Sequence, residues 1–243
     1  MRVAFTVVLA AYLVAAALRV KLKETLPPNG EGSRPKILLA FREYPKVIRE
    51  SWQVWSRAPK SAYYLFVTTI GINSLVAGCQ IFFVIYATEV RAISASQYAI
   101  AVAFMYLSIA IPAIIAGFRM DTAGRKRFLV LGYVLYIPAM LLFAVSNFYF
   151  LLASFFLFGL GNMLRVNSSQ ALLGDLIPRD LRGKAVGFLQ FFLYLAQAIA
   201  YLIVGFLYSF VAPWLPFVLL AAASVPLGIL VVFKISDPKI KEV

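Results

Sequence analysis

Histidine is absent from this 243-residue chain, and cysteine occurs once, at Cys79. Without histidine the chain lacks the commonest zinc ligand and the commonest general base, and one cysteine cannot form an internal disulfide. No carboxylate stands in the middle of a long apolar stretch. An intramembrane enzyme needs a buried cluster of Asp, Glu, His, Ser or Cys, and the sequence offers none. We therefore expect no enzymatic activity, no cofactor and no metal site.

Long polar stretches are also scarce. Apolar residues make up 63% of the chain and its mean hydropathy is +0.87, well above the roughly 45–50% apolar content of soluble domains. The net charge of +13 comes from 23 Lys and Arg against 10 Asp and Glu. These cations lie between apolar stretches and not in a folded basic domain, which argues against a nucleic-acid partner. The composition predicts an all-α membrane protein in a lipid bilayer.

Seven apolar stretches are long enough to cross a membrane, which takes about 20 helical residues. Each is predicted to be a helix, because an open strand would leave backbone groups unpaired in lipid. The stretches lie near residues 3–18, 62–87, 95–116, 128–145, 148–173, 184–209 and 213–233.

The cations fall on alternate connections between these stretches. Segment 19–60 carries ten, segment 117–127 four, segment 175–184 three and the tail three, whereas the opposite connections carry only Arg91. Because cytoplasmic loops are enriched in Lys and Arg, the cation-rich side is predicted to be cytoplasmic. The chain is expected in the cell membrane as a multi-pass protein with a cytoplasmic C-terminus.

The sequence predicts four segments along the chain. Residues 1–20 could be a signal peptide, but this would place ten cations outside, so we predict a transmembrane helix. Residues 21–60 are predicted to be a cytoplasmic linker, in which Trp52 and Trp55 belong to an amphipathic helix at the membrane surface. That helix could serve regulation or only packing. Residues 61–236 are predicted to form a unit of six helices, and residues 237–243 are predicted to form a cytoplasmic tail.

The turn at 117–127 is the most informative short segment. It resembles the cytoplasmic signature of the major facilitator superfamily, roughly Gly-x-x-x-Asp-Arg-x-Gly-Arg-Lys. Glycines would allow close approach and chain reversal, and the acid could cap a helix or pair with an arginine. The matching residues are Gly117, Asp121, Gly124, Arg125 and Lys126.

A second turn, 173–187, is similar to the Pro-x-x-x-Arg-Gly connection before the eleventh helix of that family. The proline would end one helix, an acid would favour the start of the next, and Gly183 with Gly187 could form a packing face. The residues concerned are Asp175, Pro178, Asp180, Arg182 and Gly183.

This resemblance implies that the seven helices correspond to helices six to twelve of the family, the last six forming an inverted three-plus-three repeat. It further implies part of a secondary transporter that moves a small-molecule substrate by alternating access. The chain would be a truncated or split transporter, or one that pairs with a separately encoded amino-terminal half or a second copy. The alternative is a non-transporting scaffold or regulatory half.

Polar residues inside the predicted helices are the candidates for the substrate cavity. Asn162, Arg165 and Ser169 share one helical face, and Arg165 could line the cavity or extend to the cytoplasmic surface. Asn73 and Gln80 share a face of another helix, where they could contact a ligand or bond between helices.

Overall fold

The structure, a computed structural model, describes residues 2–20, 55 and 58–237. All regular elements in these residues are helical. They are α1 (Arg2–Val20), α3 (Lys60–Ile85), the π-helical turn η1 (Tyr86–Val90), α4 (Ala95–Ala123), α5 (Arg125–Ala144), α6 (Phe148–Leu176), α7 (Arg182–Phe206), the π-helical turn η2 (Leu207–Val211) and α8 (Leu215–Lys234).

Two compact units divide the chain, Met1–Tyr44 and Pro45–Val243. In the first unit, α1 is a helix over the residues expected from its apolar run. In the second unit, six helices are long and apolar enough to cross a membrane. The all-α membrane architecture is therefore confirmed, while the seventh span, at α1, stays a prediction.

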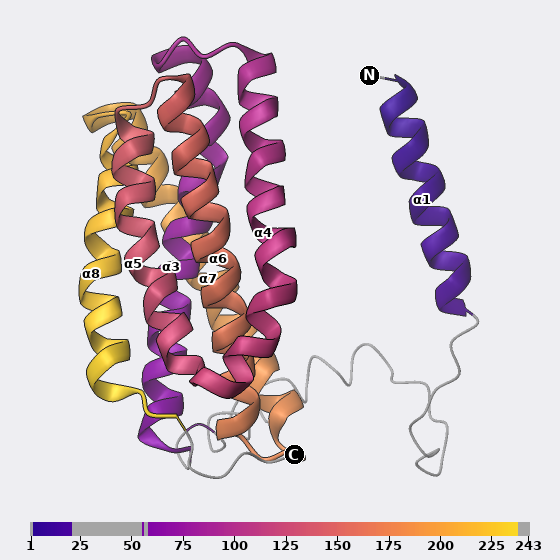
Figure 1. Cartoon of the computed structure of the whole chain (residues 1–243), viewed down its shortest axis with the longest axis vertical. Helices are drawn as coiled ribbons and strands as arrows, with labels where there is room; N and C mark the ends of the chain where they lie inside the picture. Colours follow the sequence, from indigo (N-terminus) through magenta and orange to yellow (C-terminus); the bar gives the residue numbers. More distant parts are fainter. Residues whose placement is uncertain (1, 21–54, 56–57, 238–243) are drawn as a thin grey trace, which may run out of the picture. The chain divides into compact units, whose positions relative to one another are not determined.

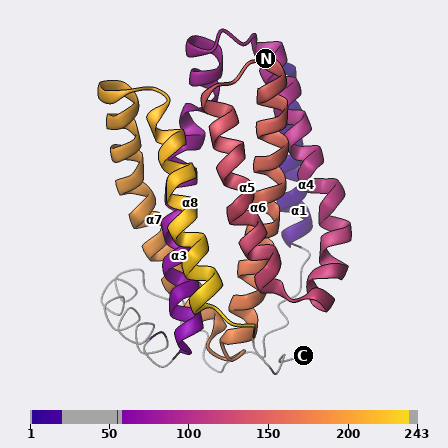
Figure 2. The ribbon, with the colours of Figure 1, turned by 60° about the vertical axis from the view of Figure 1, so that its left-hand side comes forward.

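The six helices of the second unit alternate in direction and form one bundle (Figure 1). The first three helices, α3, α4 and α5, correspond in order to the last three, α6, α7 and α8. Accordingly, α4 packs on α6 as α7 packs on α3, and α5 packs on α6 as α8 packs on α3. The exchanged helices α3 and α6 run in opposite directions, as Figures 1 and 2 show. This arrangement is the expected inverted three-plus-three repeat.

Aromatic side chains fill the centre of the bundle. The ring of Phe83 on α3 lies 4.8 Å from Phe143 on α5, 5.7 Å from Phe155 on α6 and 5.9 Å from Phe217 on α8, measured between centroids. Tilted aromatic pairs at such distances contribute roughly 0.5–1.5 kcal/mol beyond the area they bury. Four helices are thus joined around one side chain.

Burial is uneven among the helices. In α4 and α7 only 11% and 17% of the membrane-spanning residues are buried, against 33–50% in the other four spans. Large apolar residues such as Tyr106 on α4 and Leu202 on α7 are exposed. These two helices present the apolar faces of the bundle that are least used for internal packing.

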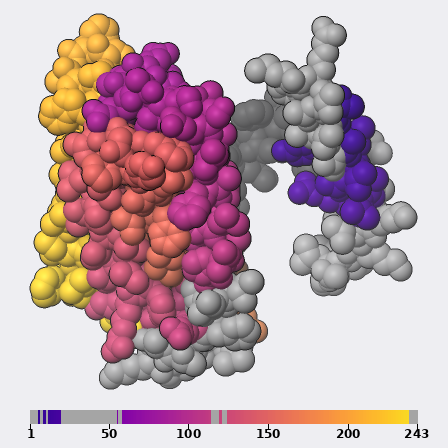
Figure 3. Space-filling model, turned by 45° about the horizontal axis from the view of Figure 1, so that its top comes forward, coloured from indigo at the N-terminus to yellow at the C-terminus, as the bar shows by residue number. Residues whose placement is uncertain are grey.

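At the end of the bundle opposite the 117–127 segment, one arginine joins the chain after α3 to the turn between α5 and α6. Arg91, just after η1, donates from Nε to the Ser146 carbonyl at 2.7 Å and from Nη2 to the Val145 carbonyl at 2.8 Å. Tyr86 donates to the Ala144 carbonyl at 2.6 Å. Figure 3 shows the segment after α3 and the α5–α6 turn side by side at this end. The carbonyls left open where α5 ends are thereby bonded.

The predicted amphipathic helix lies outside the described residues except for Trp55. The Trp55 side chain is buried, and its ring packs 4.6 Å from Phe66 on α3 and 6.4 Å from Phe188 on α7. Trp55 therefore packs against the bundle, and the role of the predicted helix stays a prediction. The Pro- and Gly-rich segment 24–36 and the tail beyond Asp237 also lie outside the described residues.

Candidate functional site

Two glycines set the geometry around the buried arginine. Gly132 on α5 faces Gly161 and Arg165 on α6 so closely that a Cβ added at Gly132 would lie 2.8 Å from the Gly161 carbonyl oxygen. It would also lie 2.8 Å from Cβ of Arg165 and 2.9 Å from its backbone nitrogen. Small residues let helix backbones approach in this way. The crossing holds Arg165 against α5 inside the bundle.

The Arg165 side chain is 1% exposed, so it does not extend to the surface. Its Nη2 donates to Oδ1 of Asn73 on α3 at 2.7 Å and to Oδ1 of Asn162 at 3.1 Å. Its Nε donates to the hydroxyl of Tyr136 on α5 at 3.2 Å. Three of the predicted cavity residues therefore meet in one polar network, deep between α3, α5 and α6.

Tyr136 is a member of this network that the sequence reading missed. Its hydroxyl donates to Asn162 Oδ1 at 2.9 Å and accepts from Arg165, whose guanidinium carbon lies 5.6 Å from the ring centroid. A hydroxyl can donate and accept at once, and a ring face attracts a cation. A tyrosine in an apolar helix carries no sequence signal for this contact.

A cavity of about 350 Å³ lies beside the network, between α3, α6 and α7. Asn73 and Ser169 line it, while Arg165 and Asn162 stand behind its wall. Gln80, two turns along α3 from Asn73, is exposed and does not line this cavity. The structure thus brings four of the five candidates to one region and leaves Gln80 outside it.

The turn within the signature segment, residues 117–127, is shorter than the sequence predicted. Helix α4 continues to Ala123 and α5 starts at Arg125, so only Gly124 breaks the helices between 117 and 127. Gly124 has φ of +91°, a backbone conformation that glycine adopts without a steric penalty. The surroundings of Gly117 and the side chain of Asp121 lie outside the part that the structure describes, so the capping or pairing role of Asp121 stays a prediction.

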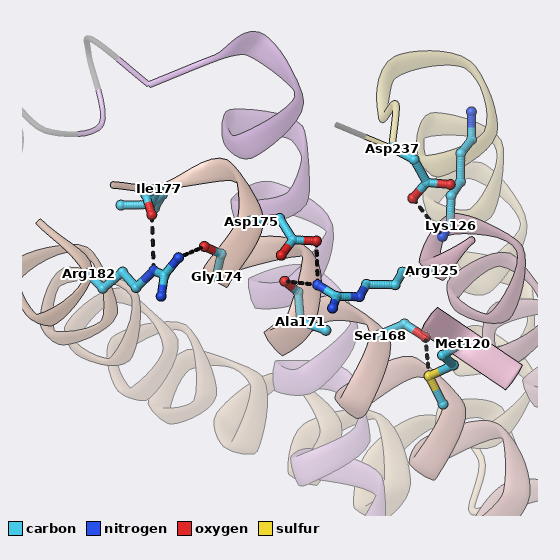
Figure 4. A network of polar contacts seen from close by, with 10 residues as sticks. All are labelled: Met120, Arg125, Lys126, Ser168, Ala171, Gly174, Asp175, Ile177, Arg182 and Asp237. Atoms are coloured by element: carbon cyan, nitrogen blue, oxygen red, sulfur yellow. Dashed lines mark hydrogen bonds and ion pairs between the residues drawn. The ribbon is translucent and has the colours of Figure 1, made fainter. Parts of the chain in front are cut away.

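The two predicted turns are joined by an ion pair (Figure 4). Arg125 at the start of α5 donates from Nη1 to Oδ2 of Asp175 near the end of α6, and to the Ala171 carbonyl at 2.9 Å. The side chains are 18% and 10% exposed. Both residues were predicted from the sequence to belong to the two turns. Their contact could not be predicted, because they stand 50 positions apart in the chain.

Arg182 connects α7 to the end of α6. Its Nε donates to the Ile177 carbonyl at 3.1 Å and its Nη2 to the Gly174 carbonyl (Figure 4). The last carbonyls of a helix lack intrahelical partners, so this arginine satisfies the C-terminus of α6. Pro178 follows directly, where a proline was expected to end the helix.

Three other residues of the second turn make no such contact with the described residues. Asp180 is exposed, and the N-cap of α7 is Leu181, whose side chain makes no capping hydrogen bond. A Cβ at Gly183 or Gly187 would meet no atom of the described chain within 4 Å. The small-residue face expected there has no packing partner in the described residues.

An acid from the predicted tail caps α5. Oδ1 of Asp237 accepts from the backbone nitrogen of Lys126 at 3.1 Å, and a Cβ at Gly124 would lie 2.9 Å from its other oxygen (Figure 4). A carboxylate at a helix N-terminus satisfies an open donor and interacts favourably with the helix dipole. No local motif could reveal this contact, which joins residues 111 positions apart.

Replacing Asp237 by alanine should lower the stability of the bundle by about 1 kcal/mol, because a helix N-terminus loses its cap. Thermal unfolding of the purified chain in detergent measures the effect. Asp180→Ala removes an exposed acid from the neighbouring turn and serves as the matched control, with an expected change near zero. Equal shifts for the two variants would contradict the capping role.

Comparisons with known proteins agree with this architecture. A search of curated protein sequences found no significant match. Two solved structures of a peptide transporter, POT, each in complex with sulfate, align with a TM-score of 0.61 and 22% identity. The alignment covers 75% of this chain and 40% of the transporter, so the likeness establishes the fold, and the chain spans less than half of these structures.

A sequence model of the Major Facilitator Superfamily matches residues 67–243. Most of the chain is thereby covered, and the chain belongs to the major facilitator superfamily.

Proposed function

We propose that this chain forms one half of a secondary transporter that moves a small solute by alternating access. The observation that carries the proposal is the cavity between α3, α6 and α7, placed beside a polar network inside an inverted three-plus-three bundle. In transporters built from such repeats, substrate sites lie near the membrane midplane at the repeat interface. Arg165 stands eleven residues before the end of α6, about 17 Å from it at 1.5 Å per residue.

A transporter half needs a second half to complete its cavity. The exposed apolar faces of α4 and α7 are suited to this contact, because internal packing uses them least. The second half is an amino-terminal six-helix unit, or a second copy of the chain that supplies the same surface. The ends that carry Gly124 and Asp175 face the cytoplasm, in accord with their cations.

Alternating access by rocking requires each half to move as a rigid body. The ties at the Gly124 end support this requirement. Arg125 joins α5 to α6, Arg182 joins α7 to α6, and Asp237 joins the segment after α8 to α5. Ser61 at the start of α3 lies 3.1 Å from Ser236, hydroxyl to hydroxyl. Five helices are thereby linked at one end.

Solute flux in proteoliposomes tests the proposal. The chain alone, as a monomer, should give no saturable uptake from a panel of radiolabelled small solutes, whereas the chain joined to an amino-terminal six-helix half should give saturable uptake of at least one. The joined protein in which the cavity is filled by Ser169→Trp is the control, and its uptake should be lost. A folded, joined protein that moves no solute would favour the scaffold or regulatory role instead.

A further inference from the structure

The charge of Arg165 has no counter-charge among the described residues. Its three hydrogen-bond acceptors are two neutral amides and a phenol, and no described carboxylate lies within ion-pair distance. Its Nη1 is buried and has no hydrogen-bond partner in the part of the chain that the structure describes. A buried, unpaired charge is costly in a protein and more so within a membrane. Some anion is therefore needed to balance this guanidinium.

The network also turns its remaining donors away from Arg165. Arginine has no acceptor, so Asn73 and Asn162 must each present the amide oxygen to it. Their amide nitrogens are then left to donate elsewhere, and Asn73 lines the cavity. The side of the network next to the cavity thus offers the amide N–H groups of Asn73, backed by the positive charge of Arg165, an arrangement that suits an anion.

The lining of the cavity points the same way. Its fifteen residues include no acid and one cation, Arg182, beside uncharged polar groups and a largely apolar wall. The apolar part consists mainly of Leu65, Phe66, Leu173, Val186, Leu189 and Leu193. A volume of about 350 Å³ falls within the range of small-ligand sites, roughly 300–1,000 Å³. An apolar body with one charged end would satisfy both kinds of surface.

We infer that this cavity binds a small amphipathic organic anion, whose carboxylate or phosphate group is held by Asn73 with Arg165 as its counter-charge. The inference rests on the proposed transport function, since it names the substrate class of the same site. The apolar part of the ligand lies against the leucines of α3, α6 and α7. A neutral analogue of the same shape lacks the ionic contact and binds more weakly.

Isothermal titration calorimetry on the full chain in phosphatidylcholine nanodiscs tests this binding without any transport measurement. The probes are benzoate and phenyl phosphate, each an apolar ring with one anionic group, and benzamide as the neutral isostere. At least one anion should bind saturably and at least about tenfold more tightly than benzamide, the difference that one charge-assisted hydrogen bond provides. Which anion binds better tells carboxylate from phosphate.

Asn73→Asp is the decisive variant. It places a carboxylate where the amide oxygen now accepts from Arg165 at 2.7 Å, so the chain supplies its own counter-charge. Anion binding should fall by about tenfold or more, while the melting temperature should rise because the buried cation is paired. The rise shows that the variant is folded. Arg179→Gln, which removes an exposed cation outside the cavity lining, should bind as the unchanged chain does.

Equal binding of benzoate and benzamide, or no binding of either anion, would overturn the inference. If no anion binds and Asn73→Asp still raises the melting temperature, the missing counter-charge is a carboxylate of the second half and not a ligand. Loss of benzoate binding when phosphatidylglycerol is added to the nanodisc would assign the site to a lipid head group instead of a free solute. Each of these results leaves the flux experiment to decide on transport separately.

Discussion

Replacing Gly132 by alanine should destabilise the six-helix bundle by about 2–3 kcal/mol, the upper range for overpacking. The new Cβ would lie 2.8–2.9 Å from three atoms of α6, two of them backbone atoms that cannot rotate away. The helices α5 and α6 must separate to accept it, and this separation also moves Arg165 away from Tyr136. Denaturation of the purified chain in detergent, followed by circular dichroism, measures the loss.

Gly187→Ala is the matched control for this change. It introduces the same methyl group into α7, where no described atom lies within 4 Å of the new carbon. Its stability should stay equal or rise by up to about 1 kcal/mol, since alanine is a better helix former than glycine. A loss for Gly187→Ala as large as that for Gly132→Ala would show that the crossing at Gly132 has no special role.

Breaking the pair between Arg125 and Asp175 should have the next largest effect. Asp175→Asn leaves a half-buried guanidinium without its carboxylate, at an expected cost of about 2 kcal/mol. This value lies between the 0–1 kcal/mol of exposed pairs and the roughly 3–5 kcal/mol of fully buried ones. The estimate follows from side chains that are 18% and 10% exposed. The same denaturation experiment measures it.

A double-mutant cycle separates the pair from its surroundings. If the contact is direct, Arg125→Gln and Asp175→Asn together should cost about 1–2 kcal/mol less than the sum of the single changes. Arg127→Gln, which removes an exposed cation two residues away on α5, should cost little and show no coupling with Asp175→Asn. Additive effects of Arg125→Gln and Asp175→Asn would mean that the ion pair contributes nothing to stability.

The class of the protein could be predicted from composition, because 63% apolar residues in seven runs leave few alternatives to a helical membrane protein. Six of the runs are helices long enough to span a bilayer, with starts within three residues of the prediction, a typical error for element boundaries. The ends were less accurate at 117–127. Backbone hydrogen bonding within a helix continues through polar residues such as Arg119, so polarity alone did not end α4.

The candidate site could be predicted only in part. Asn73, Asn162, Arg165 and Ser169 were found because polar groups are costly in lipid and therefore carry information wherever they occur. Tyr136 was missed, because a tyrosine is common in apolar helices and its hydroxyl gains meaning only from its neighbours. The burial of Arg165 was also undecided, since the same side chain could have extended toward the surface.

The sequence by itself determined the features that depend on local spacing and on the transfer of side chains from water to lipid. These features are the helices, their alternating direction, the cation-rich end of the bundle and the family resemblance carried by Gly124 and Arg125. What only the tertiary structure decided are the contacts between residues far apart in the chain. Arg165 with Asn73, Arg125 with Asp175, and Asp237 with Lys126 are separated by 92, 50 and 111 positions. A hydrogen bond depends on distances of a few tenths of an ångström, and these are set by how glycines such as Gly132 let whole helices approach.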